Sequence, residues 1–185
     1  MPARLESRWT YDDYLLFPED GRRHEIVDGE RHVTPSPNAK HQRVSRELLL
    51  AIGNFLEQSP VGEVYDAPFD VVLSESDVVQ PDLLVVLKER SGIITDKNVR
   101  GAPDLVVEIV SETTRRTDEI IKRKLYERHG VREYWIVDPE LETAKVYRLG
   151  GEGFSPAKHL SMEAGDSLAS PLLPGLSIPL AEIFE

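Results

Sequence analysis

Two short apolar runs, each carrying one acidic side chain, constrain this chain more than any other feature. Residues 82–87 read Asp-Leu-Leu-Val-Val-Leu, and residues 105–110 read Leu-Val-Val-Glu-Ile-Val. Continuous runs of leucine and β-branched residues are typical of strands that are covered on both faces of a sheet. A buried strand does not normally tolerate an ionised carboxylate unless the charge is paired or binds a metal ion. Asp82 and Glu108 are therefore the first candidates for functional residues.

Helix and strand signals alternate along the rest of the chain. Asp28-Gly29 between two short runs predicts a hairpin over residues 24–33. Apolar residues at helical spacing predict helices over 41–58 and 117–129, the second ending at Gly130. Shorter helices are expected at 10–17 and 180–184, an irregular link at 91–102, and strands at 61–67, 69–73, 133–137 and 144–149. This alternation predicts an α/β fold with a mixed central sheet flanked by helices, in a single domain over residues 1–185.

Charge and composition narrow the class of protein. The formal net charge is −11, which counts against a nuclease or other nucleic-acid binder, because phosphate neutralisation needs clustered lysine and arginine. The absence of cysteine excludes disulfides and thiolate ligands and fits a reducing compartment. No apolar run approaches the roughly 20 residues of a membrane-spanning helix, and residues 1–9 contain no apolar signal-peptide core. We therefore expect a cytoplasmic protein with no membrane partner.

Three acidic residues could together form a metal site. Asp82, Glu108 and Glu25 each lie within or at the edge of an apolar run. Hard cations such as Mg²⁺ prefer carboxylate oxygens together with water and substrate phosphate. A metal ion held there would polarise a phosphodiester and lower the pKa of a bound water, with a nearby lysine stabilising the developing charge. Each carboxylate could instead cap a loop or pair with lysine or arginine, and the residues alone leave both interpretations open.

The helix expected at 117–129 would supply the amine. Ile121 and Leu125 mark its buried stripe, and Lys122 and Lys124 flank this stripe on opposite sides, so spacing does not choose between them. The alternative for Lys122 is an ordinary helix-surface ion pair with Asp118, four residues earlier. The other basic residues of 115–128 would contact phosphate if the chain binds nucleic acid.

Other catalytic signatures are missing from the sequence. The five histidines show no metal-ligand spacing, so a zinc site is not expected. His41 begins a helix after a proline-rich loop, which suits a residue that assists at the site and equally suits a surface residue. No glycine-rich phosphate loop, Gly-x-Ser-x-Gly elbow or dinucleotide-binding motif is present, so kinase, serine-hydrolase and dehydrogenase readings lack support.

The order of several short motifs resembles the Uma-two family, which is placed in the restriction-endonuclease-like PD-(D/E)xK superfamily. The resemblance extends from about Thr10 to the C-terminus, and its motifs are specific only as an ordered set. They are Glu25-Ile-Val-Asp-Gly29, His41, Pro81-Asp82, Pro103-Asp104-Leu105-Val106-Val107-Glu108, Asp118-x-x-x-Lys122-x-x-x-Tyr126, and Gly130-Val131-x-Glu133-Tyr134-Trp135-Ile136-Val137-Asp138.

The resemblance implies a restriction-endonuclease-like core and a Mg²⁺- or Mn²⁺-dependent endonuclease acting on DNA. It implies Asp82, Glu108 and Glu25 as metal ligands and favours Lys122 over Lys124 as the amine, with His41 assisting. It also implies a homodimer. One departure concerns the usual Glu-x-Lys motif, because Val110 stands where the superfamily has lysine.

Two alternatives remain open at this stage. One is a catalytically inactive module that keeps the nuclease fold and serves in binding or regulation, which the acidic net charge and the missing Glu-x-Lys favour. The other is a nuclease that acts on RNA.

Overall fold

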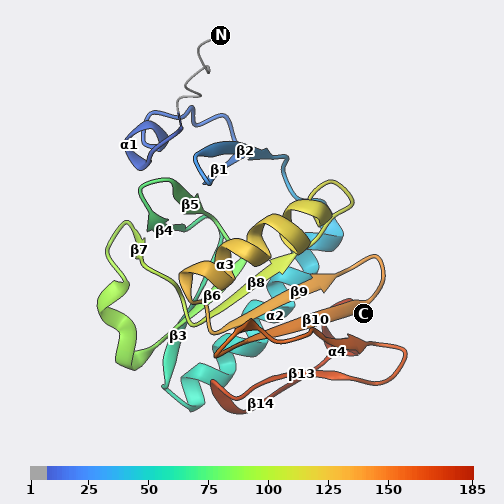
Figure 1. Cartoon of the computed structure of the whole chain (residues 1–185). Helices are drawn as coiled ribbons and strands as arrows, with labels where there is room; N and C mark the ends of the chain where they lie inside the picture. The colour runs from blue at the N-terminus through green and yellow to red at the C-terminus, as the bar shows by residue number, and fades with distance from the viewer. Residues whose placement is uncertain (1–7) are drawn as a thin grey trace.

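The computed structural model describes residues 8–185, and its strands form two mixed sheets and a separate hairpin (Figure 1). The large sheet has the order β11-β10-β9-β8-β6-β3, with β12 paired to β10. Its central strands β6 and β8 are antiparallel, whereas β8 and β9 are parallel, so the predicted mixed central sheet is confirmed. In chain order the strands are β3 (Gly62–Asp66), β6 (Leu83–Leu87), β8 (Leu105–Ile109), β9 (Glu133–Asp138), β10 (Thr143–Gly150), β11 (Gly153–Phe154) and β12 (Lys158–Ser161).

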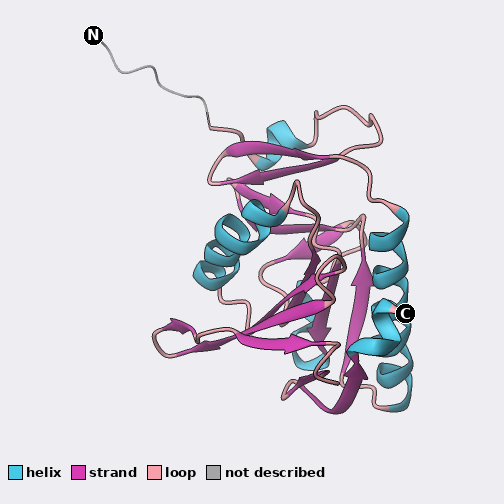
Figure 2. Cartoon of the chain, turned by 90° about the vertical axis from the view of Figure 1, so that its right-hand side faces the viewer, coloured by secondary structure: helices cyan, strands magenta, loops and turns pink. Residues whose placement is uncertain are grey.

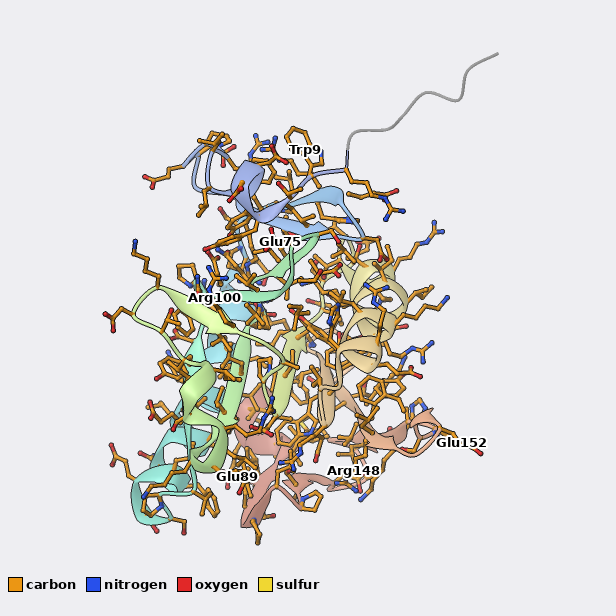
Figure 3. The ribbon with its side chains drawn as sticks, turned by 60° about the vertical axis from the view of Figure 1, so that its left-hand side comes forward. Trp9, Glu75, Glu89, Arg100, Arg148 and Glu152 are labelled. Carbon is orange, nitrogen blue, oxygen red and sulfur yellow. The ribbon has the colours of Figure 1, made fainter. Side chains whose placement is uncertain are left out.

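A smaller sheet lies at one end of the molecule. Its order is β2-β1-β5-β4-β7, and the short helix α1 (Tyr11–Tyr14) packs on it through aromatic side chains. Trp9 and Glu75 mark this end in Figure 3, and Glu89 and Arg148 lie at the opposite end. The strands are β1 (Arg23–Val27), β2 (Glu30–Thr34), β4 (Asp70–Ser74), β5 (Asp77–Val79) and β7 (Asn98–Arg100).

Helices lie on both faces of the large sheet (Figure 2). On one face α2 (Ala39–Gln58) buries an apolar stripe against alternate residues of β6 and β8, together with the hairpin β13 (Ser167–Ser170)–β14 (Leu173–Pro179) and α4 (Leu180–Phe184). On the other face α3 (Arg123–His129) packs Leu125 and Tyr126 against the intervening strand residues. Burial on both faces explains why β6 and β8 are apolar except for Glu108. Among residues 8–185, no helix is long and apolar enough to span a membrane.

Side-chain alternation along β8 decides which way Glu108 points. Successive strand residues face opposite sides of a sheet. Val107 and Ile109 belong to the cluster beneath α2, whereas Val106 and Val110 belong to the cluster beneath α3. Glu108 therefore points to the face of the sheet that α3 covers. A lysine of the helix that follows β8 can reach it there.

Three expectations differ from the structure. The helix predicted over 117–129 begins as a π-helical segment, η2 (Thr117–Lys122), before it continues as α3. The link predicted as irregular over 91–102 contains part of a 3₁₀ helix, η1 (Lys88–Ile93), and the strand β7, because three residues of this segment pair in parallel with β4. The β13–β14 hairpin was not expected, since its proline residues disfavour a strand.

Asp77 links the small sheet to α3 through hydrogen bonds. Its carboxylate, which is 4% exposed, accepts hydrogen bonds from Asp28 N at 2.8 Å, Ser74 Oγ at 2.8 Å and His129 Nε2 at 3.0 Å. Burial alone would raise the pKa of Asp77, but these bonds and the charge of Arg128 hold the pKa well below its ordinary value. The ionised carboxylate thus contributes to the stability of this junction.

We expect Asp77→Asn to lower the free energy of unfolding by about 1–2 kcal/mol at neutral pH, because charge-assisted hydrogen bonds contribute about 1.5–3 kcal/mol and asparagine keeps part of them. A depressed pKa in the folded state gives stability that is complete above the unfolded-state pKa of about 4 and is lost as the pH falls through the folded-state pKa. Urea unfolding should show a constant difference above about pH 5.5 that shrinks on acidification. A difference that grows in acid would contradict this account.

Candidate active site

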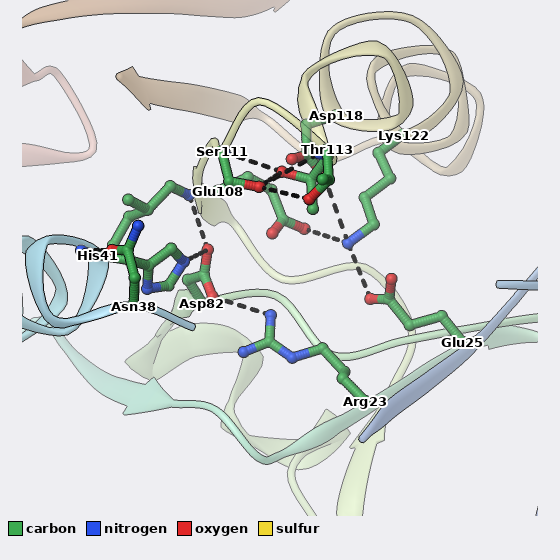
Figure 4. A network of polar contacts seen from close by, with 12 residues as sticks. Arg23, Glu25, Asn38, His41, Asp82, Glu108, Ser111, Thr113, Asp118 and Lys122 are labelled. Carbon is green, nitrogen blue, oxygen red and sulfur yellow. Dashed lines mark hydrogen bonds and ion pairs between the residues drawn. The ribbon is translucent and has the colours of Figure 1, made fainter. Parts of the chain in front are cut away.

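β1 directs two side chains at the large sheet. Arg23 and Glu25 are two residues apart on this strand, so they share one face. Arg23 Nη1 donates to Asp82 Oδ1 at 2.8 Å, and Glu25 Oε1 accepts a hydrogen bond from Lys122 Nζ at 2.8 Å (Figure 4). The hairpin predicted from Asp28-Gly29 thereby brings Glu25 to the acids of the central strands, although it is 57 residues before Asp82 along the chain.

Asp82 immediately precedes β6 and lies beside the end of β8. The register pairs Leu83 with Val107, which places Asp82 next to Glu108. Its Oδ2 accepts hydrogen bonds from Ile109 N at 2.7 Å and from His41 Nε2 at 3.2 Å. The four segments that meet here are therefore β1, the start of β6, the end of β8 and the first turn of α2.

Lys122 bridges two of the acids. Its ammonium donates to Glu25 Oε1 at 2.8 Å and to Glu108 Oε1 at 3.0 Å, and it lies 3.8 Å from Asp118 Oδ1. Lys122 is 3% exposed, whereas Lys124 lies on the surface. The structure thus brings Lys122, and not Lys124, into the cluster.

Two charged residues of the π-helical segment face the core. A π-helix is wider than an α-helix, and in proteins it is rare and concentrated at functional sites. Asp118 and Lys122 are the two buried residues of η2, while Ile120, within the same segment, is 48% exposed. Polar residues of this segment therefore face inward and an apolar one faces outward, which is the reverse of ordinary amphipathic packing.

Electrostatics separates Asp82 from the other acids. Burial raises the pKa of Asp82, but the hydrogen bond from His41, the charges of Arg23 and His41, and the Ile109 N–H outweigh burial and lower the pKa to about 2. Asp82 is therefore ionised throughout the physiological pH range.

Glu108 and Asp118 show the opposite shift. Burial raises the pKa of Glu108 to about 8, and the neighbouring acids add to this increase while Lys122 opposes it. Burial likewise raises the pKa of Asp118 to about 6, against the charge of Lys122. Lys122 itself has a raised pKa, because the attraction of the acids exceeds the effect of its burial. The four buried carboxylates of Glu25, Asp82, Glu108 and Asp118 lie near only two permanent cations, Arg23 and Lys122. A further cation would reduce this excess of acidic groups over basic ones.

The donor chemistry suits a divalent metal ion, although the acids are already engaged in hydrogen bonds. Among residues 8–185, no three acidic or histidine side chains are close enough together to form a metal-binding group. In this part of the chain, however, both bonds to Glu25 and both bonds to Glu108 end on Oε1. The second carboxylate oxygens are therefore the atoms with remaining capacity for Mg²⁺ or Mn²⁺.

Sequence reasoning missed two polar contacts of this cluster. The first is the bond from Arg23 to one carboxylate oxygen of Asp82. Nothing in the sequence marked Arg23 as a site residue except its place two residues before Glu25. Tyr126 Oη donates to Glu108 Oε1 at 2.7 Å. Tyr126 follows Lys122 by four residues, so the helical repeat that orients the lysine also orients the tyrosine.

His41 Nδ1 is buried and has no hydrogen-bond partner in the described residues, which leaves one nitrogen at the site free for another group.

The basic residues expected to contact phosphate are largely paired within the protein. Arg115 pairs with Asp138 and Glu119, and Arg128 lies 2.9 Å from Asp28. These pairs reduce the positive potential that the helix could offer to a polyanion. The structure therefore gives little support to the helix surface as the main phosphate-binding face.

Comparisons with known proteins agree with this architecture. The profile of the family described as "Uma2: Putative restriction endonuclease" matches residues 11–181. The crystal structure of "a putative nuclease belonging to DUF820" from Anabaena variabilis is similar, with a TM-score of 0.80 and 20% sequence identity over 95% of this chain and 97% of that chain. At this identity the likeness concerns the fold, and it confirms the expected α/β class. No curated protein matches the sequence.

Proposed function

Because the chain belongs to the Uma2 family, we propose that it is a Mg²⁺- or Mn²⁺-dependent endonuclease that hydrolyses phosphodiester bonds of DNA. The observation that carries this proposal is the convergence of Glu25, Asp82, Glu108 and Lys122 from four separate segments into one buried cluster. A structural ion pair needs one acid and one base. Four acids around a single lysine and arginine are costly to bury without a functional reason.

The residues have distinct roles in this proposal. Asp82, Glu108 and Glu25 would hold the metal ion through carboxylate oxygens. When bound, Mg²⁺ or Mn²⁺ supplies Lewis-acid polarisation of the phosphate and a lowered pKa for a bound water. The raised pKa of Lys122 keeps its ammonium protonated, so it would donate hydrogen bonds to the attacking water or to the charged phosphate and would not remove a proton.

His41 and Tyr126 would orient the acids. His41 Nε2 donates to Asp82, which fixes one carboxylate oxygen. Tyr126 Oη holds Glu108 Oε1, and burial raises the pKa of Tyr126 well above its ordinary value, so it stays a donor. Such partners restrict carboxylate rotation and thereby preserve the geometry of the site.

Cleavage of supercoiled plasmid tests the proposed function. We expect nicked circles to accumulate with Mg²⁺ or Mn²⁺ and not with EDTA. Duplex DNA, single-stranded DNA and RNA should be compared in the same buffer, because a preference for RNA would replace the DNA assignment. Size-exclusion chromatography of the same preparation checks the proposed homodimer.

A catalytically inactive binding or regulatory module is the second candidate. The specific observation in its favour is that every acid of the cluster already accepts hydrogen bonds from, or contacts, a lysine, arginine or histidine. Calorimetric titration with Mn²⁺ separates the two candidates: the endonuclease should bind the ion with release of protons, because Glu108 has a raised pKa. Failure to bind Mg²⁺ or Mn²⁺ at millimolar concentration would favour the inactive module.

A further inference from the structure

A narrow groove runs beside the cluster, between the β2–α2 loop and the β8–η2 loop. Two cavities of about 130 and 120 Å³ form it, and they share the wall made by Thr34, Pro35, Thr113 and Thr114. We call this the hydroxyl groove, because threonine and serine side chains supply most of its polar lining. The two loops are far apart in sequence, and the pairing of β1 with β5 and of β6 with β8 brings them together.

The inner end of the groove reaches the candidate active site. Arg23 and His41 line the second cavity, and both contact Asp82. Ser111 lines the same cavity and comes three residues after Glu108, and Figure 4 shows Ser111 and Thr113 next to the acids. A ligand in the second cavity would therefore lie against Arg23 and His41, the two residues that contact Asp82.

The lining of the groove suits an anion. Within the described residues, no aspartate or glutamate lines either cavity, although the chain has a net charge of −11. Glu112, which separates Ser111 from Thr113 in the sequence, is exposed and lines neither cavity. Arginine and hydroxyl groups can all donate to phosphate oxygens, which only accept hydrogen bonds.

The size of the groove restricts what it can hold. Both cavities are well below the about 300–1,000 Å³ of pockets that enclose drug-sized ligands. A base pair does not fit, whereas a phosphate group with part of its sugar does. The Ser111 hydroxyl bonds to the hydroxyls of Thr113 and Thr114 at 3.0 and 3.2 Å. A hydroxyl has one donor and two acceptor positions, so these groups keep capacity for a further partner.

We infer that the hydroxyl groove binds one strand of a nucleic acid, with the phosphate next to the scissile bond seated between Arg23, Ser111 and Thr113. This inference rests on the proposed function, because a scissile bond exists only if the protein cleaves nucleic acid. It deepens that function by assigning the path of the substrate strand. It places the strand in a groove whose lining contains no carboxylate and includes neither of the paired residues Arg115 and Arg128. Recognition of a single backbone in this way positions the substrate without reading its sequence.

Binding of a fluorescein-labelled decathymidylate in EDTA tests the inference without requiring catalysis. We expect Thr113→Glu to weaken binding at least about tenfold, because a carboxylate a few ångströms from a phosphate repels it by more than about 1.4 kcal/mol. Ser36→Glu, on the opposite wall of the second cavity, should act in the same direction. The matched control is Gln58→Glu, which adds the same charge at the exposed last residue of α2 and should leave binding unchanged.

Thermal melts of both groove variants will show whether they fold, and Thr113 and Ser36 are exposed, so folding is expected. Binding by both variants at the wild-type level, or no binding by the wild-type protein, overturns the inference. If the wild-type protein cleaves plasmid while both variants bind and cleave normally, the strand path is wrong and the endonuclease stands. If the wild-type protein binds the oligonucleotide only with an intact groove and never cleaves, the groove stands and the endonuclease fails.

Discussion

Asp82→Asn is expected to reduce Mg²⁺-dependent nicking of supercoiled plasmid by about a hundredfold or more. A catalytic metal ion contributes several kcal/mol of transition-state stabilisation, and each 1.4 kcal/mol is a factor of ten in rate. Asp82 is the acid whose pKa of about 2 keeps it ionised, so it provides the permanent negative charge of the proposed metal site. Asparagine has the same shape and can still accept the Ile109 N–H through its amide oxygen.

The matched control for this variant is Asp104→Asn. Asp104 is fully buried at the start of β8 and accepts bonds from Leu87 N, Arg90 and Arg132, so its replacement perturbs a comparable arginine-bonded carboxylate away from the acids. Nicking by Asp104→Asn should remain near the wild-type rate under conditions where circular dichroism shows both variants folded. Equal residual activity in the Asp82 and Asp104 variants would mean that Asp82 has only a structural role.

Several parts of this site could be predicted from the sequence because they depend on local pattern. An acid inside a β-branched run is visible as a residue that a buried strand does not tolerate, and Glu108 is buried as this argument requires. The hairpin turn at Asp28-Gly29 is equally local, and β1 and β2 pair around it. The order of the motifs then indicated the α/β core that the structure confirms.

The remaining parts depend on distant contacts or on non-standard helix geometry. Arg23 is an ordinary strand-edge arginine until β1 pairs with β5, and that pairing has no local signature. Helical spacing at 100° per residue left Lys122 and Lys124 equivalent, and it is the observed burial of Lys122 in a π-helical segment that separates them. The division into two sheets was also invisible, since a short strand such as β7 is defined by its partner β4 more than by its own residues.

Lys122→Met is expected to lower the free energy of unfolding by about 3–5 kcal/mol, measured in urea with EDTA present. Methionine fills a similar volume but leaves Glu25, Glu108 and Asp118 without their common cation in a buried site. Breaking a buried pair by removing one partner costs more than the pair contributes, because the remaining charge is uncompensated. The same substitution should abolish nicking, since the proposed ammonium donor is lost.

A second change separates uncompensated charge from lost packing. Adding Glu25→Gln to Lys122→Met removes one carboxylate that has lost its cation while keeping the shape of the side chain, so the double variant should be more stable than Lys122→Met alone. Lys124→Met is the control, because Lys124 is exposed two residues further along and its replacement should change the free energy of unfolding by less than about 0.5 kcal/mol. If the double variant is as unstable as Lys122→Met, the loss comes from packing around the lysine stem, and the crowding of acids at this site is not what makes the lysine necessary.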